Sequence, residues 1–172
     1  MQEHKQDVSQ SQFPVIGLGA SAGGLEALNM FFEAMPAHSG MAFVVVQHLA
    51  PDQESILHEI IQRHTPISVQ RISDETVMQP DQVYVLPSGY ELSLWENQLL
   101  LTTMPENSGW PQTINRFFQS LALNRGEKAA ALILSGAGHD GTDGARLVKT
   151  KGGLVIAQDL ETAAQSSMPF NI

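Results

Sequence analysis

Three apolar runs in this chain are each short enough for one strand, and none of them shows polar alternation. Residues 14–18 read Pro-Val-Ile-Gly-Leu, residues 42–46 read Ala-Phe-Val-Val-Val, and residues 130–134 read Ala-Ala-Leu-Ile-Leu. Successive side chains of a strand point to opposite faces, so a run without polar residues must be buried on both faces. Sheets of this kind are parallel and covered by helices. The sequence therefore predicts an α/β fold with a mostly parallel sheet and helices on both faces.

The rest of the pattern completes an alternating order of strands and helices. Apolar residues recur at helical spacing in several segments, and further short strand-like segments lie between them. Glu91–Trp95 and Gln98–Thr102 flank Glu96-Asn97, which predicts an antiparallel hairpin. The predicted helices are 23–34, 53–64, 112–124 and 142–151, and the further strands are 67–71, 83–86 and 154–157.

A polar tail precedes a single domain. Residues 1–12 read as a disordered tail, and residues 13–172 are the length of one domain. The chain stops shortly after the strand 154–157, where the alternating order would continue into a covering helix. We therefore expect the C-terminal end of the domain to be truncated.

Composition excludes several classes of function. Eighteen acidic residues against nine basic ones give a formal net charge of −9, which opposes binding to nucleic acid. Cysteine is absent, which excludes disulfides, thiol catalysis and cysteine zinc sites. His58 and His64 do not share a helix face, as metal ligands at i and i+4 would. We expect neither a metal nor a cofactor.

The amino-acid sequence shows neither a membrane-spanning segment nor an export signal. No apolar run approaches the roughly 20 residues of a membrane span, and the first twelve residues contain no apolar signal region. We therefore expect a cytoplasmic protein without membrane insertion.

A polar residue near glycine or proline follows each of the three apolar runs. Ser21 follows the first run, His48 the second and Asp140 the third. The carboxyl ends of parallel strands meet at one edge of a sheet, so we expect these side chains to converge in one crevice. Serine, histidine and aspartate are the components of a hydrolytic triad. Ser21, His48 and Asp140 are therefore the candidate catalytic residues.

Each of these residues also has a structural interpretation. Ser21 precedes a predicted helix, and serine is a common cap of helix N-termini. Asp140 can equally cap the helix 142–151, as can Asp143. A single histidine is more often structural or on the surface, but among the six histidines only His48 ends a buried strand.

The residues around Ser21 also fit a nucleotide-binding pattern. Gly17-Leu-Gly19-Ala-Ser-Ala22 matches G-x-G-x-x-G/A between a strand and a helix. That pattern requires an acidic residue about 20 positions further on, at the end of the second strand. Here the second strand ends in Gln47-His48, and Asp52 lies beyond a proline. A nucleotide-binding domain is therefore the weakest interpretation.

Several motifs together resemble a known family, the catalytic domain of the CheB-type protein-glutamate methylesterases of chemotaxis. The resemblance extends from about Phe13 to the end of the chain. It rests on a nucleophile motif, a histidine motif, an aspartate motif and several shorter matches. These are Gly19-Ala-Ser-Ala-Gly-Gly24, Gln47-His48 with Pro51 nearby, Gly136-Ala-Gly-His-Asp-Gly141, Val83-Tyr-Val-Leu-Pro87, Phe117-Phe-Gln-Ser120, Gly153-Leu-Val-Ile-Ala-Gln158 and Met168-Pro169.

The resemblance implies a doubly wound, mostly parallel sheet with the antiparallel hairpin toward one edge. It also implies a methylesterase-like catalytic domain with Ser21 as nucleophile, His48 as base and Asp140 as the residue that orients the base. The implied reaction is hydrolysis of glutamyl methyl esters on the cytoplasmic helices of methylated chemoreceptors, and some members also deamidate glutamine. Residues 40–49 look most like the variant that is joined to a CheR-type methyltransferase. We therefore expect a methyltransferase and sensory modules C-terminal in the same polypeptide, and no receiver domain before the esterase.

Two positions depart from the family pattern. Ala22 stands where the family often has Thr after the nucleophile, and Ala137 stands where it often has Met in the aspartate motif. Both positions border the implied active site, and neither belongs to the triad. The departures leave an alternative function open, a catalytically silent interaction or sensory module of a larger chemotaxis-type signalling protein.

Overall fold

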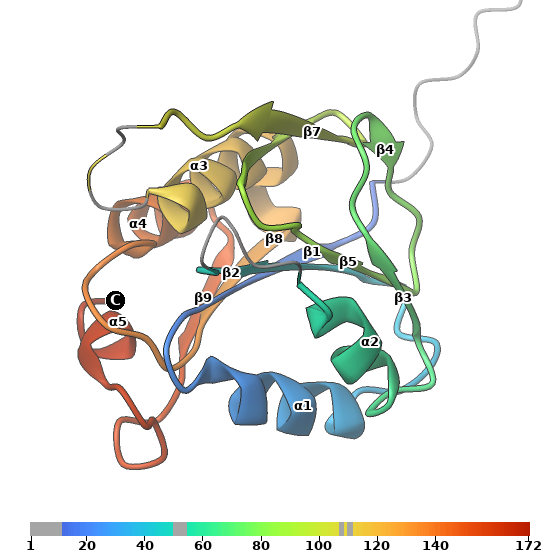
Figure 1. Cartoon of the computed structure of the whole chain (residues 1–172). Coiled ribbons are helices and arrows are strands. Elements are labelled where there is room, and N and C mark those ends of the chain that lie inside the picture. The colour runs from blue at the N-terminus through green and yellow to red at the C-terminus, as the bar shows by residue number, and fades with distance from the viewer. Residues whose placement is uncertain (1–11, 50–54, 107–108, 110–111) are drawn as a thin grey trace, which may run out of the picture.

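The structure is a computed structural model, which describes residues 12–49, 55–106, 109 and 112–172. Strands and helices alternate along these ranges as predicted, except that five strands follow one another between residues 68 and 103 (Figure 1). In chain order the elements are β1 (Val15–Ala20), α1 (Gly24–Ala34), β2 (Ala42–Gln47), α2 (Leu57–Gln62), β3 (Ser68–Arg71), β4 (Thr76–Val77), β5 (Gln82–Val85), β6 (Tyr90–Trp95), β7 (Gln98–Thr103), α3 (Thr113–Arg125), the 3₁₀ turn η1 (Gly126–Lys128), β8 (Ala129–Ile133), α4 (Thr142–Thr150), β9 (Leu154–Ala157) and α5 (Ser167–Phe170).

The main sheet confirms the predicted doubly wound α/β fold. Its strand order is β3-β5-β2-β1-β8-β9, and every neighbouring pair is parallel. From β1 the chain passes to β2 and then to the edge strand β3, comes back to β5 between β3 and β2, and later crosses to β8 on the other side of β1. The carboxyl end of β1 is therefore a topological switch point, the position at which open α/β sheets bind ligands.

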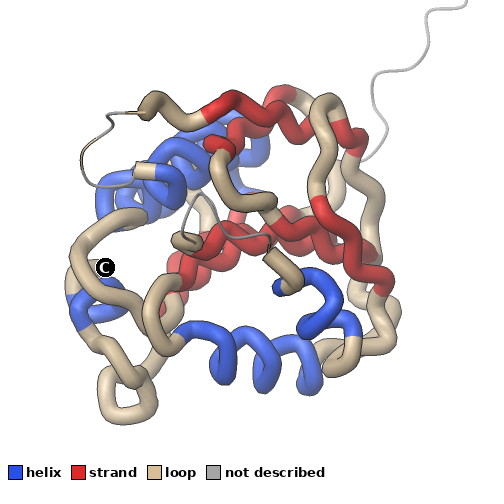
Figure 2. Tube along the Cα trace, in the orientation of Figure 1, coloured by secondary structure: helices blue, strands red, loops and turns tan. Residues whose placement is uncertain are grey.

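Two hydrophobic cores lie on opposite faces of this sheet. Alternate residues of β2 enter different cores, with Val44 and Val46 in one and Phe43 and Val45 in the other. Helices α1 and α2 cover one face, whereas α3 and α4 cover the other (Figure 2). This burial on both faces is the property that the unbroken apolar runs predicted.

A second, three-stranded antiparallel sheet has the order β4-β7-β6. The predicted hairpin is present as β6 and β7, with Trp95 opposite Gln98 next to the turn. Arg125 at the end of α3 donates a hydrogen bond to the carbonyl of Glu96 at 2.7 Å, which fastens this turn to the helix. The short elements β4 and α5 were not predicted, because two to four residues are too few to show a period.

Some predicted segments lie partly outside the described residues. The predicted helix 53–64 is observed as α2, Leu57–Gln62, and residues 50–54 are outside the described ranges. The predicted disordered tail, residues 1–12, also lies outside them except for Gln12.

Glycines in β1 allow α3 to pack directly on the strand. A Cβ atom at Gly17 would lie 2.9 Å from the ring of Phe118, and one at Gly19 would lie 2.7 Å from Ile114 Cγ2. These distances are shorter than any ordinary contact, so a side chain would push the helix away. The two glycines of the nucleotide-binding pattern therefore have a packing role here, and they bring the N-terminus of α3 close to the end of β1.

Candidate active site

The ends of β1 and β2 place Ser21 and His48 side by side. The parallel register pairs Ala20 with Gln47, the last residues of the two strands. The backbone N–H of His48 then donates to the carbonyl of Ala20 at 3.2 Å, which extends the ladder by one position. Neighbouring strands lie roughly 4.8 Å apart. Ser21 and His48 therefore leave the sheet at the same level and next to each other.

The third strand brings Asp140 to the same edge. Strand β8 pairs with the other side of β1, and the N–H of Ser21 donates to the carbonyl of Ser135 at 3.0 Å, just beyond β8. Gly136 permits this close approach, because a Cβ there would lie 2.9 Å from Ser21 Cβ. The loop that continues to Asp140 therefore passes directly over the end of β1.

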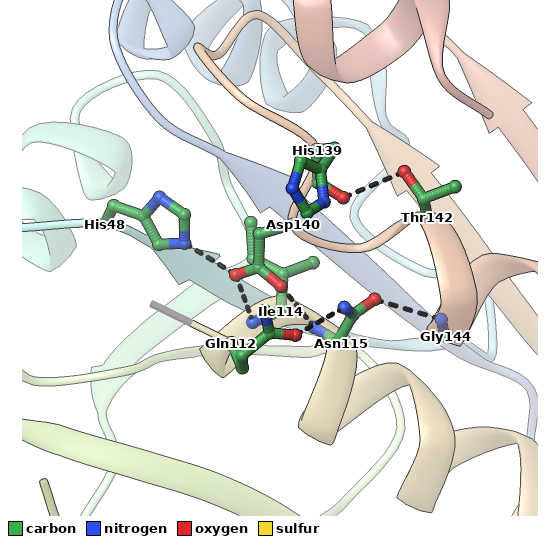
Figure 3. Close-up of polar contacts among 8 residues, drawn as sticks. All are labelled: His48, Gln112, Ile114, Asn115, His139, Asp140, Thr142 and Gly144. Atoms are coloured by element: carbon green, nitrogen blue, oxygen red, sulfur yellow. Dashed lines mark hydrogen bonds and ion pairs between the residues drawn. The ribbon is translucent and has the colours of Figure 1, made fainter. Parts of the chain in front are cut away.

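His48 and Asp140 form a direct pair. His48 Nε2 lies 2.7 Å from Asp140 Oδ2, and the side chains are 19% and 5% exposed (Figure 3). An ionised carboxylate can only accept, so the proton of this hydrogen bond belongs to Nε2. In the neutral ring this leaves Nδ1 as the acceptor, available to a group other than Asp140.

Asp140 is at the same time the N-terminal cap of α3. Its Oδ2 accepts from the N–H of Ile114, and its Oδ1 accepts from the N–H of Asn115, both at 2.9 Å. The predicted structural role therefore exists, but for a different helix: the N-cap residue of α4 is Gly141, and Asp140 does not cap that helix. Three donors and the positive end of a helix dipole surround this carboxylate, which is a favourable place for a negative charge.

Asp143, the competing candidate, lies elsewhere. It is in the first turn of α4, its side chain is 70% exposed, and it pairs with Arg146 at 3.1 Å. This pair is an exposed contact within one helix, and no contact joins it to His48 in the part of the chain that the structure describes.

Ser21 does not cap α1 with its side chain. The N-cap position is Gly23, with a left-handed φ of 77° and no side-chain hydrogen bond. Among the described residues, the hydrogen bonds of Ser21 are those of its backbone, namely the N–H to Ser135 and the carbonyl to Gly24. Its hydroxyl is hydrogen-bonded neither to His48 nor to another described residue. The alternative interpretation of Ser21 as a helix cap is therefore wrong.

Sequence reasoning missed two polar residues that shape this site. Ser135 is fully buried, donates to the carbonyl of Ala22 at 2.8 Å and accepts from the N–H of Gln165 at 2.8 Å. Asn115, in the first turn of α3, accepts from the N–H of Gly144 at 3.0 Å. The position of Ser135 directly after an apolar run was a usable signal, whereas Asn115 carries none because its partner is 29 residues away.

Metal sites and membrane-spanning helices were the other features that the sequence argued against. In the described ranges, no group of three or more His, Asp or Glu side chains is placed to hold a metal ion. None of the described helices combines the length and the apolar character that a membrane crossing needs.

Fold and site together define a class of protein: a doubly wound α/β domain with serine, histidine and aspartate around the carboxyl ends of three adjacent central strands. The family model named CheB methylesterase matches residues 16–172. The chain therefore belongs to the CheB methylesterase family, as the motif resemblance predicted.

Known relatives agree with this assignment. The crystal structure of the Thermotoga maritima CheB methylesterase catalytic domain superposes with a TM-score of 0.84 at 29% identity, covering 93% of this chain and 87% of that chain. A protein-glutamate methylesterase/protein-glutamine glutaminase of Myxococcus xanthus is 33% identical over 159 residues, which is 90% of this chain and 46% of the relative. One from Methanosarcina mazei is 29% identical over 166 residues, 92% of this chain and 45% of the relative. The chain thus spans about half the length of these two relatives.

Proposed function

We propose that this chain is a protein-glutamate methylesterase domain, which hydrolyses glutamyl methyl esters through Ser21, His48 and Asp140. One observation carries the proposal: His48 is paired with Asp140 at 2.7 Å and leaves β2 beside Ser21, at the switch point of the sheet. The names of the relatives supply the substrate, since both curated proteins described above are called protein-glutamate methylesterases.

The chemistry follows from the two ring nitrogens. With Nε2 held by Asp140, Nδ1 of His48 takes the proton from the Ser21 hydroxyl as its oxygen attacks the ester carbonyl. The tetrahedral intermediate collapses when the methoxy group leaves and takes that proton, which releases methanol. A water molecule then repeats the sequence on the acyl-enzyme and releases the glutamate side chain and the free serine.

The N-terminus of α1 is suited to the oxyanion of these intermediates. The helix begins at Gly24, directly after the turn that contains Ser21, and no described side chain caps it. The N-terminal N–H groups of a helix lack intrahelical partners and lie at the positive end of its dipole. Donors of this kind, aimed at a developing negative charge, supply much of the rate enhancement in acyl transfer.

Asp140 holds the imidazole in position and stabilises the positive charge that the ring acquires. Its own position is fixed by the N–H groups of Ile114 and Asn115, so it does not depend on His48 for its orientation. The same machinery can deamidate glutamine, with ammonia in place of methanol as the leaving group. The relatives' names include protein-glutamine glutaminase, which supports this second reaction.

For partners and location we propose the cytoplasmic helices of methylated chemoreceptors as the substrate, and hence a cytoplasmic site of action. The similarity of residues 40–49 to the fused variant supports a methyltransferase and sensory modules further along the same polypeptide. A pull-down of the full-length protein by receptor signalling domains, in their methylated and unmethylated forms, tests the first of these partners.

The decisive experiment is methanol release from receptor membranes methylated with a labelled methyl group. We expect the wild-type chain to release labelled methanol and the Ser21→Ala variant to release none above background. A wild-type chain that folds but leaves the label on the receptor would contradict the proposal and favour a silent module.

A further inference from the structure

Asn115 occupies an unusual position between the two helices that flank Asp140. It is 5% exposed and lies in the first turn of α3, where its backbone N–H donates to Asp140 Oδ1 at 2.9 Å. Its side chain points the other way: Oδ1 accepts from the N–H of Gly144 at 3.0 Å, and Nδ2 donates to Gln112 Oε1 at 2.8 Å (Figure 3). The side-chain amide is therefore bonded at both its oxygen and its nitrogen, although it is buried.

The contacts amount to an exchange of caps between two helices. Asp140, which precedes α4, caps the N-terminus of α3, while Asn115 in α3 accepts a first-turn N–H of α4. Each helix thereby fixes the start of the other. Close packing reinforces the exchange, because a Cβ at Gly144 would lie 2.6 Å from Phe118 Cβ and 2.8 Å from the carbonyl oxygen of Asn115.

We propose that Asn115 is a positioning residue for the catalytic pair: its side chain sets the start of α4, and thereby the place from which Asp140 holds His48. This inference rests on the proposed function. The physical reason is the shortness of the connection, since only Gly141 and two helical residues separate Asp140 from Gly144.

Loss of the Asn115 side chain has a direct consequence for the site. The N–H of Gly144 would be left buried without its acceptor, which is costly enough that the segment must move to find another. Movement of the start of α4 displaces Asp140 relative to α3 and to His48. Small displacements of catalytic groups are expensive, about 10²-fold for roughly 1 Å.

Three variants of the 172-residue chain separate positioning from stability. Asn115→Ala removes both side-chain hydrogen bonds. Asn115→Asp keeps an acceptor oxygen for the N–H of Gly144, and its second oxygen can accept from the Gln112 side chain once that amide group flips. Asn124→Ala is the matched control: Asn124 is also a hydrogen-bonded asparagine of α3, accepting from Glu96 N–H and donating to the carbonyls of Leu94 and Ser120. It lies roughly 13 Å further along the helix.

Two readouts are needed, besides the melting temperature of each variant. The first is kcat and KM for methanol release from methylated receptor membranes. The second is the downfield proton resonance of the His48 Nε2–H, which reports its hydrogen bond to Asp140 without any turnover. For Asn115→Ala we expect kcat to fall about tenfold, KM to stay within about twofold, and the resonance to shift upfield or vanish through exchange. Asn115→Asp should restore the wild-type kcat and the resonance. Asn124→Ala should melt at a lower temperature and yet keep the wild-type kcat and the resonance.

The outcomes decide between positioning and simple stability. The proposal is overturned if Asn115→Ala, assayed below its melting temperature, keeps the resonance and the kcat of the wild type. It is also overturned if Asn124→Ala loses as much kcat and as much of the resonance as Asn115→Ala does. Should Asn115→Ala not fold, Asn115→Asp decides: a folded variant with the resonance supports the proposal, and one without it refutes the proposal. If the wild-type chain proves inactive, the proposed function is refuted but the role of Asn115 is not. The resonance would still report whether Asn115 positions the pair of His48 and Asp140.

Discussion

Two helix N-termini meet at the candidate site, and they are used in opposite ways. The N-terminus of α3 is occupied, because both oxygens of Asp140 accept its first N–H groups. The N-terminus of α1, which follows Ser21, starts at a left-handed glycine and has no side-chain cap among the described residues. One helix end therefore binds the carboxylate of Asp140. The other has no side-chain cap among the described residues and, under the proposed mechanism, receives the negative charge that develops during the reaction.

Under the proposed mechanism, this difference gives serine and aspartate separate roles at neighbouring strand ends. Asp140 would then serve both the fold and the reaction, so its loss should affect both folding and catalysis. The Ser21 hydroxyl makes no hydrogen bond to a described residue, so its loss should affect catalysis alone. The predictions below test this asymmetry, from the largest expected effect to the smallest.

Ser21→Ala should lower the rate of methanol release by on the order of 10³-fold or more, while the melting temperature stays unchanged. Adding His48→Ala should cost little further, because residues that act as a unit are not additive. Single-turnover assays on methylated receptor membranes, with circular dichroism of each variant, check both statements. Turnover close to wild type in Ser21→Ala would remove Ser21 from the mechanism.

Asp140→Asn should lower kcat on the order of 10²-fold or more and should also destabilise the fold by about 1 kcal/mol, the typical value of a lost helix cap. The amide offers one acceptor oxygen in place of two, so it cannot serve His48, Ile114 and Asn115 together. Denaturant titration and kcat measure the two effects separately.

The matched control for that variant is Asp143→Asn. Asp143 is a neighbouring aspartate in an exposed pair with Arg146, and such pairs contribute little to stability. We expect its kcat and unfolding midpoint to stay near the wild-type values. Equal losses in both variants would mean that Asp140 has no special role.

Gly23→Ala tests the open helix end and should lower kcat about tenfold. The glycine has a φ of 77°, and a Cβ would lie 2.6 Å from Ala164 Cβ and 2.9 Å from Ser135 Oγ. Backbone strain alone costs about 1–2 kcal/mol for an L-residue in this conformation, and relief of the crowding would move the turn that carries Ser21.

Gly40→Ala separates strain from crowding. Gly40 has a similar φ of 74°, but a Cβ there meets nothing within 4 Å. This variant should lose comparable stability in a urea titration and retain its kcat. If both variants lose activity equally, the effect of Gly23→Ala is one of general stability rather than of the helix end.

Ala137→Met should have the smallest effect, a change of a few fold in kcat/KM with no change in stability. Ala137 is exposed on the loop that carries Asp140, so a larger side chain can be accommodated without repacking the core. Comparing methyl ester and glutamine substrates would show whether the change alters preference. Identical kinetics for every substrate would show that this departure from the family pattern is neutral.

The sequence was sufficient for the architecture because the signals for it are local. The runs that became β1, β2 and β8 are apolar on both faces, and this requires a covered parallel sheet whatever the rest of the chain does. The same local pattern, an apolar run followed by a polar residue, placed Ser21 and His48 at strand ends. It failed for β4 and α5, which are too short to have a period and form only by pairing and packing with the rest of the molecule.

The tertiary structure decided which of several possible partners each polar residue meets. From the sequence, Asp140 was equally suited to cap the following helix, yet it caps α3, 26 residues earlier in the chain. Gly17 and Gly19 matched a nucleotide pattern, yet they serve the close packing of α3 on β1. Asn115 showed no signal at all. Hydrogen bonds of this kind depend on how two helices that are distant in the sequence pack against each other. No period or spacing in a single sequence encodes that packing. Strand ends, by contrast, are determined by residues that are next to one another in the sequence.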